Sequence, residues 1–214
     1  MVIIMKFLQR ISFNIFLTFF ILSTTVIWTI IGSFGIFKWD ARYLQLDLIV
    51  HLSQSRIWHN YLQVMDYLLI PNHSSLKMTD FYSSCNGLQH FHDVKILFLF
   101  VIVIWVICLL IFVSLLMYKK FTILLQINNN WLLFLTVIPI VLAACSLIDF
   151  DSLFAIFHRI LFHNSNWLFD PLKDPVINIL PDTFFCHCFI LAFVIFELLV
   201  IVLLYVNHKK SRQF

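Results

Sequence analysis

Residues Ile96 to Met117 read ILFLFVIVIWVICLLIFVSLLM, an apolar stretch without a charged residue. A helix needs about 20 such residues to cross the hydrocarbon core of a bilayer. Three further apolar runs approach or exceed this length, namely Ile11 to Phe37, Trp131 to Ile148 and Phe184 to Val206. The sequence therefore predicts a membrane all-α protein with a bundle of four transmembrane helices.

The composition of the whole chain points the same way. Hydrophobic residues make up 62% of the 214 residues and charged residues 12%, against about 45–50% and about 25% in soluble domains. This excludes a water-soluble globular protein. The three glycines form neither a G-x-G-x-x-G nor a P-loop pattern, and the net charge of +3 is not gathered in a basic domain. We therefore expect no cofactor, no nucleotide partner and no nucleic-acid partner.

Basic residues predict the orientation of the chain. The segments before the first span, between the second and third spans, and after the fourth contain lysine and arginine but no acidic residue: Lys6, Arg10, Lys119, Lys120, Lys209, Lys210 and Arg212. The positive-inside rule then places both termini in the cytoplasm. The predicted order is N-terminus and first span 1–37, extracellular region 38–95, second span 96–117, cytoplasmic loop 118–130, third span 131–148, extracellular segment 149–183, fourth span 184–206 and cytoplasmic tail 207–214.

The first extracellular region predicts a folded cap rather than a simple linker. Apolar and polar residues largely alternate over residues 44–52, a period of two that is typical of a half-buried strand. Ser53 or Ser55 can cap a helix over residues 56–69. Together with the second extracellular segment, these elements predict a small extracellular α+β cap. The expected buried face of the helix consists of Ile57, Tyr61, Val64, Met65 and Leu68.

Turn and cap signals divide the remaining extracellular residues. Asn86-Gly87 indicates a turn, after which a helix from Leu88 can continue into the second span. Asp149 and Asp151 are cap candidates for a helix that ends at His163. Its apolar stripe, at three- and four-residue spacing, suits a helix in the plane of the membrane interface.

Two histidines are the strongest candidates for chemistry. His90 lies roughly 9 Å outside Ile96 if the helix is continuous, at 1.5 Å per residue, which is the depth of lipid headgroups and ester bonds. His158 lies on the interfacial helix. Imidazole, with a pKa of about 6.5, suits proton transfer at neutral pH. Two alternatives stay open: the rings only bind headgroups, or His90 activates Cys85 as a nucleophile.

Other polar groups have simpler interpretations. His90, His92 and Asp93 are too few for a convincing metal site, which needs three or four convergent ligands, so we expect no metal. The adjacent side chains of Cys186-His187-Cys188 diverge on a helix, and we interpret them as span packing. Glu197 lies within the fourth span, where we expect a structural hydrogen bond.

Two segments resemble the lipoprotein intramolecular transacylases, called Lit. Residues 81–95 read FYSSCNGLQHFHDVK and are similar to that family's S-x-N-G-L-x-H-F-x-E-V-K. Residues 157–162 read FHRILF and are similar to its second signature, F-H-x-x-F-F with a downstream W-x-x-D-P. Here Asp93 replaces the expected Glu and Leu161 the expected Phe. The four spans also fit, so the resemblance covers nearly the whole chain.

The resemblance implies a function and a set of site residues. The reaction would move the sn-2 acyl chain of a diacylated bacterial lipoprotein from its glycerol ester to the α-amino group of the terminal cysteine, giving a lyso-form product. The family's catalytic histidines fall on His90 and His158. Expected substrate-binding residues are Asn86, Asn164, Trp167, Asp170 and Lys95. The protein would lie in the bacterial plasma membrane as a multi-pass protein, in contact with membrane lipid and with its active site at the outer leaflet.

Two alternative functions are considered. One is an acyltransferase or lipase that takes acyl chains from bulk phospholipid. The other is a non-enzymatic subunit that senses metal ions or binds a partner through its extracellular histidines.

Overall fold

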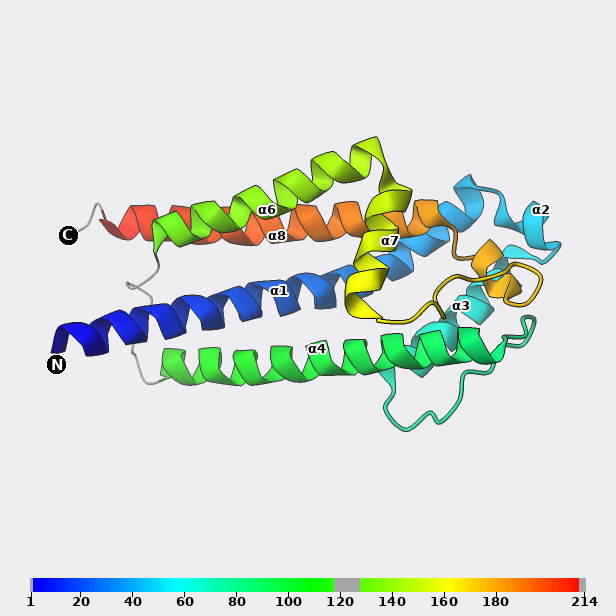
Figure 1. Ribbon diagram of the computed structural model, residues 1–214, viewed down its shortest axis with the longest axis horizontal. Coiled ribbons are helices and arrows are strands. Elements are labelled where there is room, and N and C mark those ends of the chain that lie inside the picture. Colours follow the sequence, from blue (N-terminus) through cyan, green and yellow to red (C-terminus); the bar gives the residue numbers. More distant parts are fainter. Residues whose placement is uncertain (1, 118–127, 212–214) are drawn as a thin grey trace. The chain divides into compact units, whose positions relative to one another are not determined.

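The computed structural model describes residues 2–117 and 128–211, and all regular structure in these residues is helical. The elements are α1 (Val2–Tyr43), α2 (Leu46–Val50), α3 (Gln54–Leu69), α4 (Cys85–Met117), α6 (Asn129–Ile148), α7 (Phe150–Leu161), the 3-10 helix η1 (Pro175–Asn178) and α8 (Asp182–Ser211) (Figure 1). Most of the predicted cytoplasmic loop, with Lys119 and Lys120, lies outside the described residues.

Four of these helices are long and apolar enough to cross a membrane: α1, α4, α6 and α8. Each of them contains one of the four runs predicted from the sequence. The prediction of an all-helical membrane fold with four spans is therefore confirmed. The cytoplasmic location of the termini stays a prediction.

The chain divides into two compact units. One unit consists of Met1–Thr29, Val101–Ala144 and Ile190–Phe214. Its core brings together apolar side chains of α1, α6 and α8: Phe13, Leu17, Ile21, Leu132, Leu135, Phe196 and Val200. Two indoles add polar contacts, because Trp105 donates to the hydroxyl of Thr24 at 3.2 Å and Trp131 donates to that of Thr18 at 3.0 Å.

The other unit consists of Ile30–Phe100 and Cys145–Phe189 and contains both histidine motifs. Its core centres on Tyr61 of α3, whose ring stacks on Phe37 of α1 at 3.9 Å between centroids. The Tyr61 hydroxyl shares a 2.8 Å hydrogen bond with Ser33, and Phe184 of α8 packs edge-on against both rings. The predicted buried face of α3 is confirmed, because all five of its side chains are buried.

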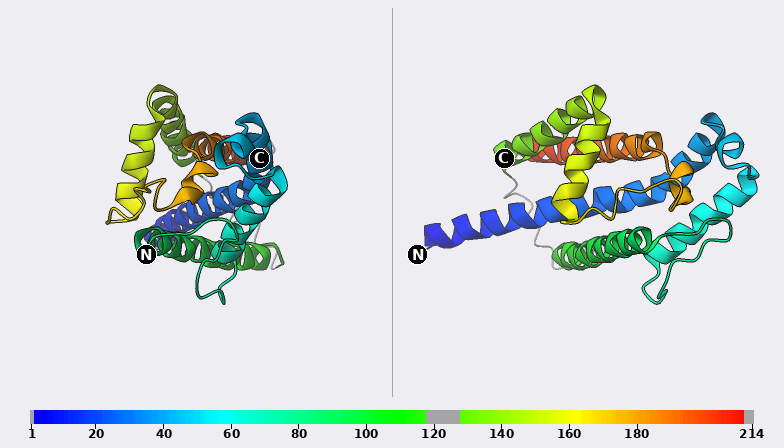
Figure 2. Two further views of the ribbon diagram at one scale, coloured as in Figure 1. Left: turned by 90° about the vertical axis from the view of Figure 1, so that its right-hand side faces the viewer. Right: turned by 45° about the vertical axis from the view of Figure 1, so that its right-hand side comes forward.

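Residues 44–52 do not form the predicted strand. They form the short helix α2, flanked by Gln45 and His51 in left-handed conformation, and α2 contacts α3 and η1 (Figure 2). The alternation was misleading because Leu48 and Ile49 are both largely exposed. In a membrane protein an apolar residue can be exposed, so alternation of apolar and polar residues predicts a strand less reliably than it does in a soluble protein.

The start of α4 also differs from the prediction. The helix begins at Cys85, so Asn86 and Gly87 lie in its first turn rather than in a preceding turn. Gly87 has no positive φ. Glycine is required at this position because of close packing, which is described below. At the other motif, α7 begins at Phe150 after its predicted cap Asp149, which accepts a 3.0 Å hydrogen bond from the Ser152 amide.

Candidate active site

A buried carboxylate fixes the beginning of α4. Asp174, just before η1, accepts hydrogen bonds of 2.7 Å from both the amide and the hydroxyl of Ser84. Ser84 in turn caps α4, because its hydroxyl oxygen accepts a 3.0 Å bond from the Gly87 amide. A Cβ at Gly87 would come within 2.8 Å of the Asp174 Cγ. Only glycine therefore fits, one turn before His90.

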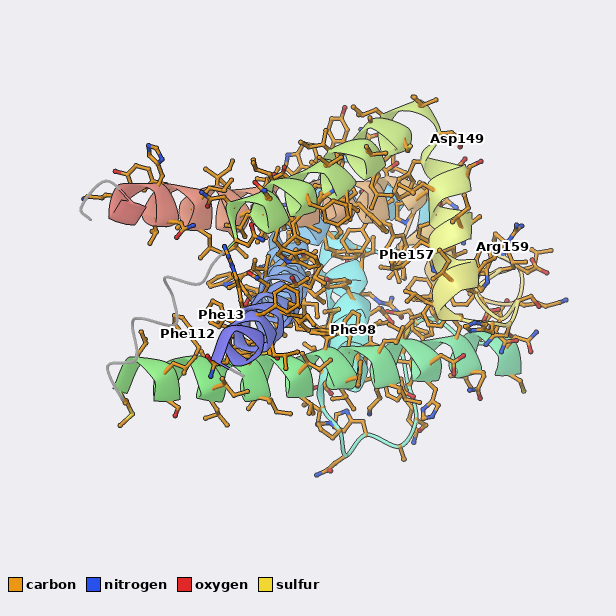
Figure 3. The ribbon with its side chains drawn as sticks, turned by 60° about the vertical axis from the view of Figure 1, so that its left-hand side comes forward. Phe13, Phe98, Phe112, Asp149, Phe157 and Arg159 are labelled. Atoms are coloured by element: carbon orange, nitrogen blue, oxygen red, sulfur yellow. The ribbon has the colours of Figure 1, made fainter. Side chains whose placement is uncertain are left out.

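Helix α7 presents the second histidine. Figure 3 shows α7 running steeply across the direction of α4, with Asp149 at its start and Arg159 in its last turn. Nδ1 of His158 lies 2.8 Å from the Phe154 carbonyl oxygen, one turn earlier. A carbonyl can only accept, so Nδ1 carries the hydrogen. Nε2 of the neutral ring is then left with its lone pair.

The two imidazoles meet. The ring centroids of His90 and His158 are 5.7 Å apart, and each residue is only 8% exposed. Phe162 contacts both rings, at 4.8 Å from His90 and 5.6 Å from His158. Trp167 packs on His158 at 4.9 Å between centroids. The pair therefore lies in an aromatic enclosure from which most water is excluded.

Burial determines the charge state of His158 in this enclosure. Desolvation lowers the pKa of His158, and the hydrogen bond to the Phe154 carbonyl offsets part of that effect. His158 is consequently neutral at pH 7 and able to accept a proton. Nδ1 of His90 is buried and has no hydrogen-bond partner among the described residues. Because buried polar atoms are normally paired, this nitrogen is a natural contact for a ligand.

A short polar network connects α4 with the segment after α7. Asp93 accepts a 2.8 Å hydrogen bond from Gln89 on one oxygen and a 3.1 Å bond from Asn164 on the other. The Asn164 carbonyl accepts a 3.0 Å bond from the Trp167 indole, whose ring covers His158. Asp93 is thereby linked to His158 through Asn164 and Trp167.

Comparison with known proteins decides the family. The family model described as lipoprotein intramolecular transacylase Lit matches residues 11–185. The chain belongs to the Lit family. It is therefore an acyltransferase of the lipoprotein intramolecular transacylase class, as the resemblance of its two motifs implied. Comparison with the curated proteins gave no match.

Solved structures extend the likeness of this Lit protein to its whole length. The integral membrane transacylase Lit from Bacillus cereus is 26% identical, with a TM-score of 0.83 over 98% of this chain and 99% of that one. Two variants of the Bacillus cereus protein, in which a histidine is replaced by arginine or by alanine, give TM-scores of 0.72 and 0.69 at the same identity. Both comparisons cover 98% of this chain, and 94% and 96% of the respective variants.

The predicted substrate-binding residues of this Lit chain occupy different surroundings. Trp167 packs on His158, and Asn164 is connected to it through the hydrogen bond from the Trp167 indole. Asn86 is exposed in the first turn of α4. Lys95 is buried elsewhere, where its ammonium group donates to the His73 carbonyl at 2.7 Å and lies 4.4 Å from the centre of the Tyr67 ring. Asp170 forms a turn, accepting a 3.0 Å bond from the Leu172 amide.

Sequence reasoning missed two features of the Lit fold. Asp174 was not predicted as a site residue, although its buried carboxylate joins the two motifs. His187, interpreted as span packing, bonds to the buried Asp40 at 2.9 Å. Neither contact has a local signal, because each joins segments far apart in the sequence.

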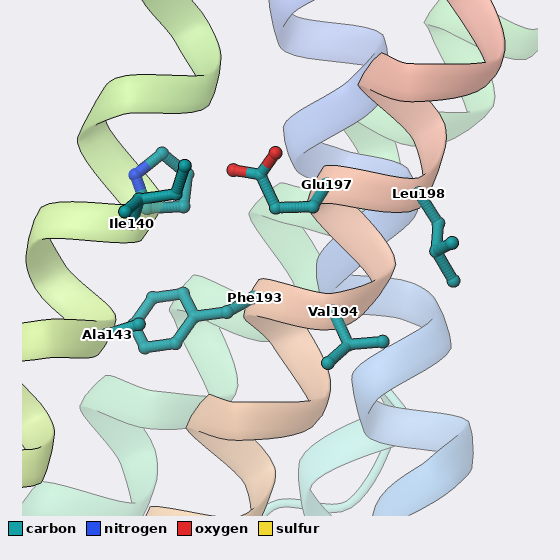
Figure 4. Close-up of a pocket in the computed structure, with 7 residues that line it drawn as sticks. Ile140, Ala143, Phe193, Val194, Glu197 and Leu198 are labelled. Carbon is teal, nitrogen blue, oxygen red and sulfur yellow. The ribbon is translucent and has the colours of Figure 1, made fainter.

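The remaining candidates do not join the histidine pair. Among the described residues no three metal-binding side chains are grouped to hold an ion. Glu197 lines an apolar pocket between α6 and α8, where it points towards Ile140 (Figure 4). One of its carboxyl oxygens has no partner among the described residues, so the hydrogen bond expected there is not confirmed for that atom.

Proposed function

We propose that this Lit protein moves the sn-2 acyl chain of a diacylglyceryl-modified lipoprotein to the α-amino group of the same terminal cysteine, using His90 and His158. The nitrogen forms a bond to the acyl carbon, and the bond from that carbon to the glycerol oxygen breaks. One proton leaves the amine and one reaches the glycerol oxygen. The observation that carries the proposal is the 5.7 Å separation of two buried imidazoles.

His158 is assigned as the base. Its Nδ1 hydrogen is held by the Phe154 carbonyl, so Nε2 has the free lone pair that receives a proton from the attacking amine. The same proton then passes to the departing glycerol oxygen. An α-amino group has a pKa of about 7.7–8.0, so its minor neutral form is the one that attacks at pH 7. The neutral imidazole accepts the proton that this nitrogen loses on forming the bond, and such a transfer typically contributes 10²–10⁴-fold.

His90 is assigned to the carbonyl oxygen of the ester. Negative charge develops on that oxygen as the amine attacks, and a donor held in a dry site stabilises it more strongly than water does. The unpartnered Nδ1 of His90 supplies such a donor when it carries the ring hydrogen. The two rings can then act on opposite sides of one acyl carbon.

The reaction requires no energy input from the protein. Exchange of an ester for an amide is downhill, and the amine and the ester belong to one molecule. The site has only to bring them into contact and exclude water, which saves the entropic cost of a bimolecular encounter. The sequence supports an outer-leaflet position, because His90 precedes the apolar run by about the depth of a headgroup layer and the positive-inside rule places this end of the run outside.

Mass spectrometry of a lipoprotein N-terminus tests the proposal. Cells that lack other transacylases would express the wild-type chain, His90→Ala or His158→Ala. We expect lyso-form lipoprotein with the wild type and persistence of the diacylglyceryl form with either variant. His92→Ala, an exposed histidine on the same helix, is the matched control and should convert normally. Full conversion by either active-site variant would remove that histidine from the reaction.

A second measurement separates this reaction from acyl transfer out of bulk lipid. The purified protein would receive a diacylated lipopeptide in vesicles of phospholipid with labelled acyl chains. Unlabelled N-acyl product is expected, because the chain comes from the lipopeptide itself. Label in the product would contradict intramolecular transfer.

A further inference from the structure

An open groove lies beside the histidine pair, between α4 and the end of α7. It encloses about 290 Å³. Its lining combines the apolar side chains of Ile96, Leu97, Leu161 and Phe162 with the polar side chains of Asp93, His163 and Asn164. A mixed lining of this kind suits a ligand that has an apolar chain and a polar head.

The groove adjoins the site. Phe162, which lines it, also contacts both imidazoles, at 4.8 Å from His90 and 5.6 Å from His158. Leu97 follows His90 by two helical turns and so lies on the same face of α4, roughly 10 Å further along. The groove therefore shares Phe162 with the histidine pair and extends along α4 as far as Leu97.

We propose that this groove holds the sn-2 acyl chain, the one that migrates, and that Leu97 limits its length. The inference rests on the proposed function. A carbonyl held between His90 and His158 has its own alkyl chain at the mouth of the groove. The sn-1 chain is attached through another glycerol carbon, and its position is not fixed by the two histidines.

The size of the effect follows from burial of apolar surface. Each buried methylene contributes about fourfold to binding. A larger side chain at Leu97 would exclude the distal part of a long chain, whereas a smaller one would leave space that a short chain does not fill. The ratio of rates on long and short chains should therefore move in opposite directions for the two changes.

The experiment uses diacylglyceryl lipopeptides with a constant sn-1 palmitoyl chain and either octanoyl or palmitoyl at sn-2. Full-length wild type, Leu97→Phe and Leu97→Ala would be purified, and kcat/KM measured for both substrates. We expect Leu97→Phe to shift the preference about tenfold towards octanoyl, equivalent to between one and two methylenes. Leu97→Ala should shift it towards palmitoyl. Val103→Phe, exposed on α4 and outside the groove lining, should leave the ratio unchanged.

The outcomes separate this inference from the function on which it rests. Each variant is compared with itself on two substrates, so partial loss of folded protein cancels from the ratio. An unchanged ratio in both Leu97 variants, with the wild type active, would overturn the groove and leave the transacylase intact. Reciprocal substrates would keep palmitoyl at sn-2 and carry either octanoyl or palmitoyl at sn-1. If the Leu97 variants changed the ratio of rates on these two substrates instead, that result would also overturn the inference. Failure of the wild type on every lipopeptide would instead reject the proposed function.

Discussion

The carboxylate of Asp174 accepts both the amide and the hydroxyl of Ser84, each at 2.7 Å. This contact joins the segment after α7 to the cap of α4, the helix that presents His90. Asp174 is 4% exposed, so no water can replace these bonds without rearrangement. The relative placement of the two histidine motifs depends on this one side chain as well as on apolar packing.

Replacement of Asp174 should destabilise the protein. Asp174→Ala leaves the half-buried Ser84 amide without its acceptor, which costs about 1–3 kcal/mol, and lowers the melting temperature in detergent. Asp174→Asn keeps one acceptor oxygen and should recover part of the loss. Thermal unfolding followed by tryptophan fluorescence measures both. Asp170→Ala, at a half-exposed turn, is the control, and an equal loss there would contradict a special role for Asp174.

Gly87→Ala should be destabilising, although alanine is favoured over glycine by about 1 kcal/mol inside helices. The added Cβ would lie within 2.8 Å of the Asp174 Cγ. The same change in an Asp174→Ala background should become neutral or stabilising. A double-mutant cycle of melting temperatures checks this reversal. Additive effects would show that Gly87 is needed for a reason other than Asp174.

The sequence predicts the four spans well because hydrocarbon imposes the same requirement on every crossing residue. An apolar run such as Ile96 to Met117 is long enough to cross the hydrocarbon core and is therefore recognised as a span. The buried face of α3 was predictable for a similar reason, since Ile57, Tyr61 and Val64 recur at helical spacing. In both cases the decisive signal is local.

The contacts that build the site are not local. The motif resemblance pointed to His90 and His158, and coordinates add that their rings meet. Pairing of Asp174 with Ser84 depends on how two distant segments fold back, which no periodicity encodes. The prediction of a strand over residues 44–52 was wrong, because apolar residues of a membrane protein can be exposed as well as buried. The spans could therefore be predicted from local patterns in the sequence, whereas the contacts within the site depend on the tertiary structure.

The pH dependence of the reaction should reflect His158. Burial lowers the pKa of this histidine below its usual 6.5, so its neutral form predominates at pH 7. Protonation of the substrate's α-amino group lowers the rate below about pH 8, and protonation of His158 should add a second, steeper fall as pH drops through its lowered pKa. Phe162→Ala admits water to the ring and should move this acidic limb up towards pH 6.5. Profiles of kcat/KM on a lipopeptide measure the shift of this second fall, and a wild-type profile that Phe162→Ala leaves unchanged would contradict the assignment.

Stability should follow the same titration. An unfolded His158 binds a proton near pH 6.5, whereas the folded form binds it only at lower pH. The contribution of the buried neutral ring is therefore fully present above pH 6.5 and is lost as pH falls through the folded-state pKa. Melting temperatures between pH 7 and pH 5 should decline, and less so for His158→Phe. Equal declines would indicate that other groups control acid unfolding.

The network from Asp93 to His158 should affect turnover more than stability. Asp93→Ala releases Asn164, and through it Trp167, whose ring covers His158. A small displacement of the base lowers kcat by about tenfold, since errors near 1 Å can cost about 10²-fold. Asp93→Glu should retain activity, and Asn164→Asp should lose it because two carboxylates would face each other. Single-turnover rates measure these effects. Equal loss in Asp93→Glu and Asp93→Ala would argue against the network.

The orientation of the chain can be tested with a cysteine that it already contains. Cys85 is exposed at the start of α4, in the region that the positive-inside rule places outside the membrane. A membrane-impermeant maleimide added to intact cells should label it. Cys85→Ser should abolish the labelling, whereas Cys145→Ser, which removes another exposed thiol located within the apolar run of α6, should not. Labelling of Cys85 only after the cells are opened would place the beginning of α4 in the cytoplasm. His90, one turn and a half further along α4, and its neighbour His158 would then be removed from the outer leaflet, and the substrate would have to reach them from the other side.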